Sequence, residues 1–242
     1  MPIFLIFLVF LSQSIFATTL PATNFQVTHD FISKMVKEHH FSKTELVSIF
    51  SQVNLIVAEK KPKSTIKKPK AKAMSWDKYR SLFITDSRIE NGVEFWKNNL
   101  KALKRAEKKY NVPQEIIVAI LGIETNYGEN QGQHFALETL ARLSFGNHRR
   151  KKFYQKELKE FLLMSRENTL PPLLIKGSYA GAMGYGQFIS SSYRYYAVDF
   201  DFDGKIDLFS NPVDAIGSIA NYFDKHHWHD FGSYARPITL TD

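Results

Sequence analysis

Cysteine is absent from the 242 residues of this chain, and the absence excludes several kinds of chemistry. Without thiols there is no disulfide framework, no cysteine-ligated zinc site and no thiol nucleophile. A lipid anchor attached to an N-terminal cysteine is excluded as well. The chain therefore does not belong to the disulfide-rich class of small secreted proteins or to the thiol enzymes.

The N-terminal apolar stretch, PIFLIFLVFL, is shorter than the approximately 20 residues that a membrane-spanning helix takes. It is followed by SQSIFA, an arrangement typical of a secretory signal peptide. We therefore expect residues 1–17 to be a signal peptide that is cleaved near Ala17, the alternative being an uncleaved apolar segment. Because the chain also has no cysteine for lipidation, we expect an exported, soluble protein.

Acidic residues are fewer than basic ones, 24 against 32, which gives a formal charge of +8. The excess is local, because Lys60–Lys72 contains seven lysines and no acidic residue. A nucleic-acid-binding domain carries its positive field over a whole face, so we expect no nucleic-acid partner. The two prolines and few apolar residues of this segment predict a solvated linker or loop over residues 60–75. A weak contact with an anionic surface is the alternative.

Alternating patterns that would demand a sheet are not found, and apolar residues instead recur at helical spacing. Over residues 18–59 they predict an N-terminal helical hairpin. Ser42 and Glu45 form a capping box that is expected to open its second helix. The predicted fold class is therefore mainly α.

Residues 76–242 predict a second and larger helical domain. Its first long helix is expected to follow a capping box at Ser87 and Glu90, and Pro113 marks the first turn of the next helix. The apolar stripe of the long helix is formed by Val93, Trp96, Leu100, Leu103 and Tyr110.

The segment Gly177–Tyr193, GSYAGAMGYGQFISSSY, has four glycines within ten residues. Glycine removes side-chain bulk where a ligand could lie against the backbone. Ser178, Tyr185 and Gln187 add polar and aromatic groups around these glycines. The composition indicates that the segment could form the floor of a sugar-binding site.

Glu124 lies in VPQEIIVAILGIETNYG, in which the isoleucines at 116, 117 and 120 form an apolar helical stripe. At about 100° per residue Glu124 falls inside that stripe, which predicts a carboxyl on the buried side. Desolvation raises the pKa of such a group from about 4.3 toward neutrality and suits it to protonate a glycosidic oxygen. The alternative is a structural carboxylate, hydrogen-bonded or paired with Arg142 or Arg149, and the spacing favours neither hypothesis.

Four segments carry a closer resemblance: IIVAILGIETNYG, LARLSF, KELKEFLLMSRE and KGSYAGAMGYGQFISSSYRYYAVDFDFDGKIDLFSNPVDAIGSIANYF. Together they resemble the lytic murein transglycosylase B family, from about Trp76 to Trp228, with a weaker echo in the N-terminal helices. The resemblance implies a lysozyme-like helical catalytic core within residues 76–242. It also implies a periplasmic enzyme that cleaves peptidoglycan glycan strands between N-acetylmuramic acid and N-acetylglucosamine.

The resemblance further implies that Glu124 is the single catalytic acid/base. In this family the acid protonates the leaving oxygen, the substrate's acetamido group stabilises the anomeric cation, and the muramyl 6-hydroxyl closes a 1,6-anhydro ring. One carboxyl is sufficient, because substrate-assisted glycosidases need no second one on the protein. The expected substrate-binding residues are Ser178, Gln187, Tyr79, Tyr222, Tyr185 and Met183.

The segment DFDFDGKIDLFSNPVDA fits a calcium-binding loop of EF-hand type, with oxygen ligands at alternate positions and a glycine at the sharp turn. Ser210 occupies the twelfth position, where such loops have a bidentate glutamate. Because the resembling family has a lengthened loop, we expect Asp214 to close a site over residues 199–214, where calcium would brace the helices structurally. The expected ligands are Asp199, Asp201, Asp203, Lys205 through its carbonyl, Asp207 and Asp214.

Two features depart from the family pattern. Ser190 stands where the family usually has proline, and the chain stops at Asp242, where family members usually continue with an aromatic-rich segment beside the cleft. The second departure leaves open a catalytically weak or inactive peptidoglycan-binding protein, or a muramidase that hydrolyses the same bond. In each case we expect a monomer that binds peptidoglycan glycan strands and needs no cofactor for catalysis.

Overall fold

The computed structural model describes residues 22–53 and 74–228, with side chains described from Thr28 onward. The predicted signal peptide, nearly all of the predicted linker and residues 229–242 lie outside the described residues. The chain divides into two compact units, Met1–Gln52 and Val53–Asp242. No helix in the described part combines the length and apolarity that a bilayer crossing requires.

The first unit contains α1 (Ala22–His39) and α2 (Lys43–Ser51), which pack against each other. The hydroxyl of Ser42 accepts a hydrogen bond from the Glu45 amide, so α2 begins where its sequence signal predicts. The rings of Phe31 and Phe50 make an edge-to-face contact, with 5.9 Å between their centroids. These contacts are local to the first unit.

The second unit is mainly helical, as predicted. Its helices are α3 (Trp76–Ser81), α4 (Asp86–Tyr110), α5 (Gln114–Thr125), α6 (Ala136–Phe145), α7 (Lys151–Glu167), α8 (Ser190–Tyr196) and α9 (Pro212–Lys225). Two short antiparallel strands, β1 (His134–Phe135) and β2 (Lys176–Gly177), place His134 opposite Gly177. Strands of two residues are too short to give a periodic signal, which is why the sequence did not predict this sheet.

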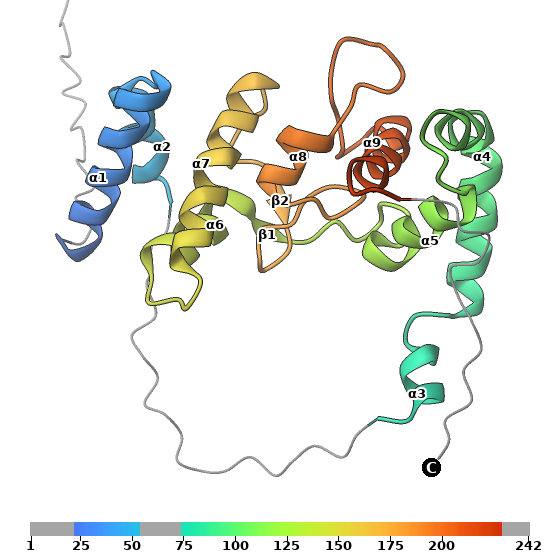
Figure 1. Cartoon of the computed structure of the whole chain (residues 1–242). Helices are drawn as coiled ribbons and strands as arrows, with labels where there is room; N and C mark the ends of the chain where they lie inside the picture. Colours follow the sequence, from blue (N-terminus) through green and yellow to red (C-terminus); the bar gives the residue numbers. More distant parts are fainter. Residues whose placement is uncertain (1–21, 54–73, 229–242) are drawn as a thin grey trace, which may run out of the picture. The chain divides into compact units, whose positions relative to one another are not determined.

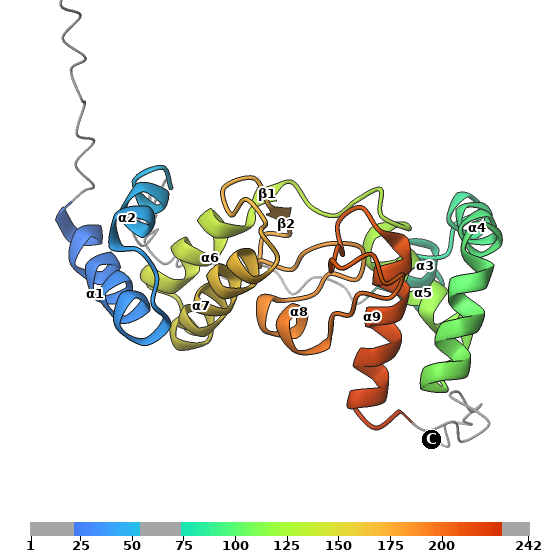
Figure 2. The same cartoon turned by 90° about the horizontal axis from the view of Figure 1, so that it is seen from above.

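Within this unit the helices form two groups that α8 connects (Figures 1 and 2). Helix α4 packs against α5 and α9, α6 packs against α7, and α8 contacts both α7 and α9. Side chains such as Leu103, Ile117 and Ile216 are fully buried in the first group, and Leu158 and Phe161 are fully buried in the second. The glycine-rich segment follows β2 and leads into α8, so it runs between the two groups.

The predicted start and apolar stripe of α4 are partly wrong. Thr85 caps the helix by accepting a hydrogen bond from the Arg88 amide, so the predicted capping box at Ser87 and Glu90 lies inside the helix. The backbone leaves helical geometry at Asn99. Val93 and Leu100 of the predicted stripe are 48% and 40% exposed. The buried residues, which recur at helical spacing on both sides of Asn99, are Gly92, Phe95, Ala102, Leu103, Ala106 and Tyr110.

The ends of α5 and α9 follow recognisable signals. Pro113 is the residue before α5, and Asn211 caps α9 by accepting hydrogen bonds from the Val213 and Asp214 amides. At the other end of α9, His227 adopts a left-handed conformation with φ 60°. Its amide donates to the Asp224 carbonyl and the Trp228 amide donates to the Phe223 carbonyl, both at 3.0 Å. This is a Schellman motif, in which glycine usually occupies the left-handed position.

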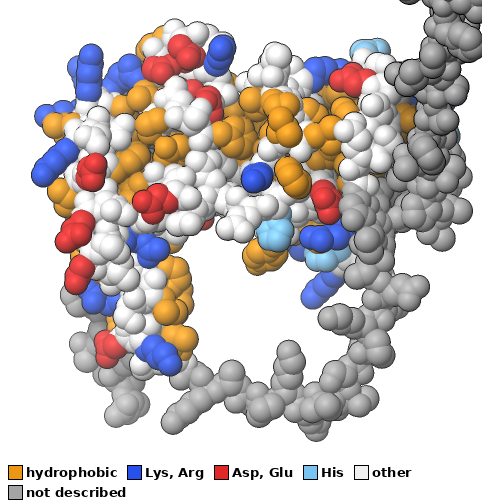
Figure 3. Space-filling model, turned by 180° about the vertical axis from the view of Figure 1, so that it is seen from behind, with side chains coloured by type: hydrophobic (Ala, Val, Ile, Leu, Met, Phe, Trp, Pro, Cys, Tyr) orange, Lys and Arg blue, Asp and Glu red, His pale blue; other side chains and the backbone are white. Residues whose placement is uncertain are grey.

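Charged side chains of both signs are interspersed on the face shown in Figure 3. Lysine and arginine do not gather there into one continuous field. That nucleic acid is not a partner stays a prediction.

Candidate active site

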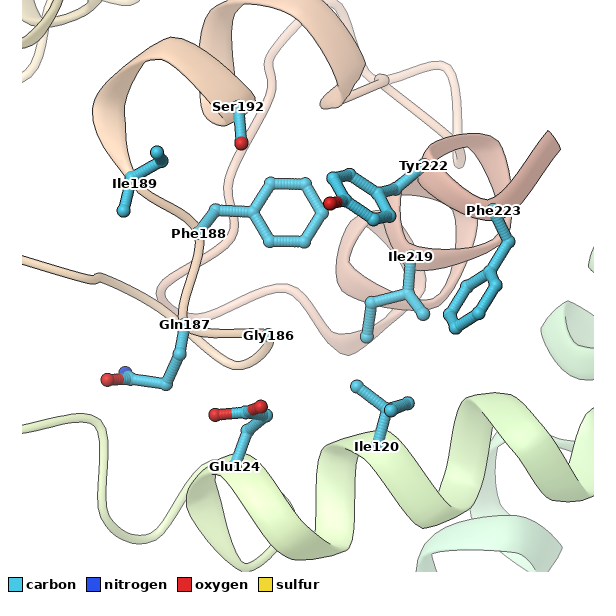
Figure 4. A pocket seen from close by; sticks show the side chains of 10 residues that line it. All are labelled: Ile120, Glu124, Gly186, Gln187, Phe188, Ile189, Ser192, Ile219, Tyr222 and Phe223. Atoms are coloured by element: carbon cyan, nitrogen blue, oxygen red, sulfur yellow. The ribbon is translucent and has the colours of Figure 1, made fainter. Parts of the chain in front are cut away.

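A cavity of about 330 Å³ lies between α5, the glycine-rich segment with the start of α8, and α9 (Figure 4). Three stretches of sequence that are far apart in the chain contribute its walls. The lining residues are Ile120, Glu124, Gly186, Gln187, Phe188, Ile189, Ser192, Ile219, Tyr222 and Phe223. Two of the predicted substrate-binding residues, Gln187 and Tyr222, and the predicted acid Glu124 therefore meet in one cavity.

Glu124 is the carboxyl of this cavity, and no other Asp or Glu lines it. Figure 4 shows its carboxylate pointing from the last turn of α5 toward Gly186 and Gln187. Within the described part of the chain the carboxylate makes no hydrogen bond or ion pair. Neither Arg142 nor Arg149 holds it, so the geometry does not support the alternative of a structurally paired carboxylate.

The predicted burial of Glu124 is wrong in degree. The buried face of α5 consists of Ile117, Val118, Leu121, Gly122 and Thr125, whereas Ile116 and Ile120 are half-buried and Glu124 is exposed. Four residues advance a helix by about 400°, so the row from 116 to 124 runs beside the buried face and opens into the cavity. Although its surface is accessible, the surrounding walls desolvate the carboxyl enough to raise the pKa of Glu124.

Gln187 faces the acid from the opposite wall and is held rigidly. Its side-chain amide donates to the Gln131 and Gly184 carbonyls, each at 3.1 Å. Gln131 in turn donates to the Phe209 carbonyl at 2.8 Å. These bonds fix the Nε2 side of the Gln187 amide and leave its carbonyl oxygen available to a ligand.

The remaining walls are largely apolar. The ring of Tyr222 lies 5.8 Å from that of Phe188 and stacks on His226 at 4.0 Å, measured between centroids. The rings of Phe223 and Trp228 make an edge-to-face contact with 5.2 Å between their centroids, and the Schellman motif holds Trp228 in place. Apolar walls with a few fixed polar groups are typical of sites for small ligands and sugars.

The sequence predicted that the glycines form the floor of a sugar-binding site. In the structure most of them are needed for chain packing instead. Gly184 has φ 69°, and a Cβ there would lie 2.4 Å from the Leu208 carbonyl oxygen. Gly186 is the glycine of the segment that lines the cavity. The other glycines allow the segment to fold tightly beneath it.

Four predicted substrate contacts lie outside the cavity lining. The Ser178 hydroxyl accepts hydrogen bonds from the Ala180 and Ala182 amides, and Tyr79 is exposed on α3 beside Trp76. Tyr185 is half-buried, and its contact with sugar, like those of Ser178 and Tyr79, stays a prediction. Met183 is fully buried, so its side chain belongs to the core and the expected substrate contact is wrong.

Six lining residues were not predicted from the sequence as site residues: Ile120, Phe188, Ile189, Ser192, Ile219 and Phe223. Three of them flank Gln187 closely in the sequence, and two flank Tyr222 on α9. Adjacency to a predicted site residue was the available signal. Which neighbours face the cavity depends on the packing of α5 against α9.

The acidic loop brings three of its predicted ligands together. Carboxylate oxygens of Asp199, Asp201 and Asp203 lie within 4.8 Å of one another. Asp207 and Asp214 are not part of this cluster. Asp214 is fully buried and accepts hydrogen bonds from the Phe200 and Asp207 amides at 2.7 and 2.9 Å.

The remaining predicted positions have other local roles. Burial raises the pKa of the Asp214 carboxyl, although its hydrogen bonds oppose this effect. The Asp207 carboxylate accepts from the Phe209 and Ser210 amides, and Lys205 is exposed. Asp214 therefore closes the loop by hydrogen bonding, and three clustered carboxylates are a donor set that suits a hard divalent cation.

Known proteins resemble this chain over most of its length. A family model, the transglycosylase SLT domain, matches residues 24–242. The membrane-bound lytic murein transglycosylase B of Escherichia coli (strain K12) is 48% identical over 204 residues, which are 82% of this chain and 56% of that protein. The chain thus spans little more than half the length of this relative.

Solved structures show the same fold. The soluble lytic transglycosylase SltB1 from Pseudomonas aeruginosa matches with a TM-score of 0.77 and 44% identity, over 85% of this chain and 68% of that one. The Escherichia coli lytic transglycosylase SLT35, in complex with calcium, matches with a TM-score of 0.75 and 45% identity, over 84% and 64%. These matches confirm the resemblance found in the sequence motifs, and the chain belongs to the transglycosylase SLT domain family.

Proposed function

We propose that this protein is a peptidoglycan lytic transglycosylase that cleaves the bond between N-acetylmuramic acid and N-acetylglucosamine. The observation that carries the proposal is Glu124, a single unpaired carboxyl with a raised pKa that points into an otherwise largely apolar cavity. Membership of a transglycosylase family supports it. Because peptidoglycan lies outside the cytoplasmic membrane, the proposal also requires export, as the N-terminal apolar segment predicts.

The proposed reaction uses Glu124 twice. Protonated Glu124 gives its proton to the glycosidic oxygen as the bond to the anomeric carbon breaks. The acetamido oxygen of the same sugar bonds to that carbon and carries the developing positive charge. The Glu124 carboxylate then takes the proton of the muramyl 6-hydroxyl, whose oxygen displaces the acetamido group and closes the 1,6-anhydro ring. Glu124 is protonated again, and no water is consumed.

The raised pKa of Glu124 matters for the first step. A higher pKa keeps a larger fraction of the carboxyl protonated near neutral pH, where an ordinary glutamate is almost fully ionised. As pH rises past that raised pKa, the acid is lost and the rate is expected to fall. The apolar rings of Phe188, Tyr222 and Phe223 would pack against the sugar and limit access of water.

Digestion of purified murein sacculi tests the proposal. The products should be muropeptides one water lighter than hydrolysis products, identified by mass spectrometry. Glu124→Gln should lower turnover by about 10²–10⁴-fold or more, because an amide cannot donate the proton. Glu138→Gln on α6, which lies outside the cavity lining, is the matched control and should retain wild-type rates.

Other outcomes of the same assay separate the alternatives. Reducing-end muramic acid would identify a muramidase that uses water in the second step. Binding to sacculi without any soluble product would identify a glycan-binding protein. Wild-type turnover in Glu124→Gln would remove this carboxyl from the mechanism.

We also propose that the acidic loop binds calcium. Asp199, Asp201 and Asp203 supply clustered carboxylates, and a relative with 45% identity has been solved in complex with calcium. A bound cation would relieve the repulsion between these carboxylates. Asp214 and Asp207 hold the loop in shape through amide hydrogen bonds, and α9, which begins within this loop, carries Tyr222 and Phe223 into the cavity.

A further inference from the structure

The chain directly after Glu124 adopts an unusual conformation. Asn126, Tyr127 and Gly128 have φ values of 49°, 60° and 98°, so three consecutive residues lie in the left-handed region. Residues with a side chain rarely adopt this conformation, and two of them in succession store strain. Such strain persists only where the surrounding contacts hold the turn in place.

Thr125 holds the turn from its inner side. This side chain is 1% exposed, and its hydroxyl oxygen accepts a hydrogen bond from the Gly128 amide at 3.0 Å. The same hydroxyl donates to the Tyr185 carbonyl at 2.8 Å and makes a longer contact, 3.4 Å, with the Leu121 carbonyl of its own helix. In addition, the Thr125 carbonyl accepts from the Asn130 amide at 2.9 Å.

Tyr127 holds the turn from its outer side. Its ring stacks on Phe95 of α4 with 5.4 Å between centroids. Its hydroxyl occupies a slot between α4 and α5, since a Cβ on Gly92 or Gly122 would lie 2.4 or 2.5 Å from the hydroxyl oxygen. Both glycines are therefore needed to admit the ring, and the ring fixes the end of α5 against α4.

Tyr185 belongs to the wall that faces the acid. It precedes Gly186 and Gln187, which line the cavity opposite Glu124 (Figure 4). The Thr125 hydroxyl thus joins the last turn of α5 directly to the backbone of the facing wall. It donates to the facing wall and accepts from the turn that follows α5.

We propose that Thr125 is a positioning residue for Glu124, whose hydroxyl fixes the distance between the carboxylate and the facing wall formed by Gly186 and Gln187. The inference rests on the proposed function of Glu124. Thr125 touches neither substrate nor reacting atoms and acts through the neighbouring acid. Small displacements of a catalytic group lower rates strongly, by as much as about 10²-fold for 1 Å.

Two substitutions separate the hydroxyl from the shape of the side chain. Thr125→Val keeps the shape and removes the hydrogen bonds of the hydroxyl, whereas Thr125→Ser keeps the hydroxyl. We expect Thr125→Val to lower kcat on sacculi by about tenfold or more with KM within about twofold, and Thr125→Ser to stay within about threefold of wild type. Thr139→Val, at another buried threonine on α6, is the control and should leave kcat unchanged.

A second measurement does not depend on turnover. NMR titration of the Glu124 carboxyl should show its pKa moving down toward the ordinary value in Thr125→Val, because a looser wall admits water, and returning in Thr125→Ser. If Thr125→Val does not fold, Thr125→Ala takes its place in the comparison with Thr125→Ser. The titration is then done at a temperature where circular dichroism shows the native helices.

The outcomes distinguish this inference from the proposed function. Wild-type kcat and an unchanged Glu124 pKa in Thr125→Val would overturn the positioning role, as would equal losses in the serine and valine variants. A wild-type protein that releases no anhydro product would instead overturn the proposed function. In that case the pKa titration alone decides the role of Thr125.

Discussion

The ion pair between α7 and α8 offers a direct test of how the wall of the cavity is held. Glu160 of α7 is 1% exposed and receives hydrogen bonds from Arg194 of α8 and from Lys159, the latter at 2.9 Å. Arg194 also bonds to Glu167 at 2.6 and 2.8 Å. Helix α8 has seven residues, too few to be stable alone, and carries Ser192 of the cavity lining.

Arg194→Met removes one partner of a buried charge. Breaking such a pair typically costs about 3–5 kcal/mol, because the remaining charge is left uncompensated. Lys159 stays beside the same carboxylate, so we expect the lower end, about 3 kcal/mol. Glu167 is 45% exposed, and the loss of its partner adds little because water replaces it.

The cost depends on pH in a defined direction. Burial alone would raise the pKa of Glu160, but hydrogen bonds from Lys159 and Arg194 outweigh it, and the pKa is lowered in the folded protein. This carboxylate therefore stabilises the fold above its unfolded pKa, and the contribution is lost as pH falls through the folded pKa. In Arg194→Met the folded pKa rises, so the difference from wild type is largest near pH 7 and shrinks as acid neutralises Glu160.

Urea unfolding at pH 7 and at about pH 4 measures these differences. The double substitution Glu160→Met with Arg194→Met should recover most of the loss at pH 7, because well-packed apolar side chains replace buried ion pairs with little cost. Lys225→Met is the control, since its pair with Asp224 is exposed on both sides and should be worth less than about 1 kcal/mol. A cost below about 1 kcal/mol for Arg194→Met, or no recovery in the double variant, would refute the reasoning.

Two further predictions concern calcium and the end of α9. Adding about 10 mM calcium to chelator-treated protein should stabilise it by about 1.4–2.7 kcal/mol if the affinity is of the extracellular kind, about 10⁻³–10⁻⁴ M, as thermal unfolding would show. Asp203→Asn should abolish that shift, and the same shift in the variant would argue against this loop as the site. His227→Gly should stabilise the protein by about 0.5–1 kcal/mol, because glycine adopts the left-handed position of the Schellman motif without strain. A lower urea midpoint in this variant would contradict it.

Local signals in the sequence predicted much of the helical framework. The cap at Ser42 is confirmed, because it depends on one side chain and the amides next to it. The predicted capping box at Ser87 is wrong, because the hydroxyl of Thr85, just before the helix, caps it instead. The stripe of α4 was partly wrong because Val93 and Leu100 lie beside the buried face, which includes the small residues Gly92, Ala102 and Ala106.

The site was predictable in its chemistry and not in its geometry. The motifs brought Glu124, Gln187 and Tyr222 forward, and they do meet in one cavity. The exposure of Glu124 and the full burial of Met183 depend on how α5, α9 and the glycine-rich segment pack. Helical spacing gives the direction in which a side chain leaves the helix axis. It does not say which other element packs against that side chain.

The three-part origin of the cavity has a consequence for fragments of this protein. A fragment that ended before α9 would keep Glu124 and Gln187 but lose the wall formed by Ile219, Tyr222 and Phe223. The cavity would then be open to water on that side. If this cavity is the active site, as proposed, each nascent chain would stay inactive until α9 has docked.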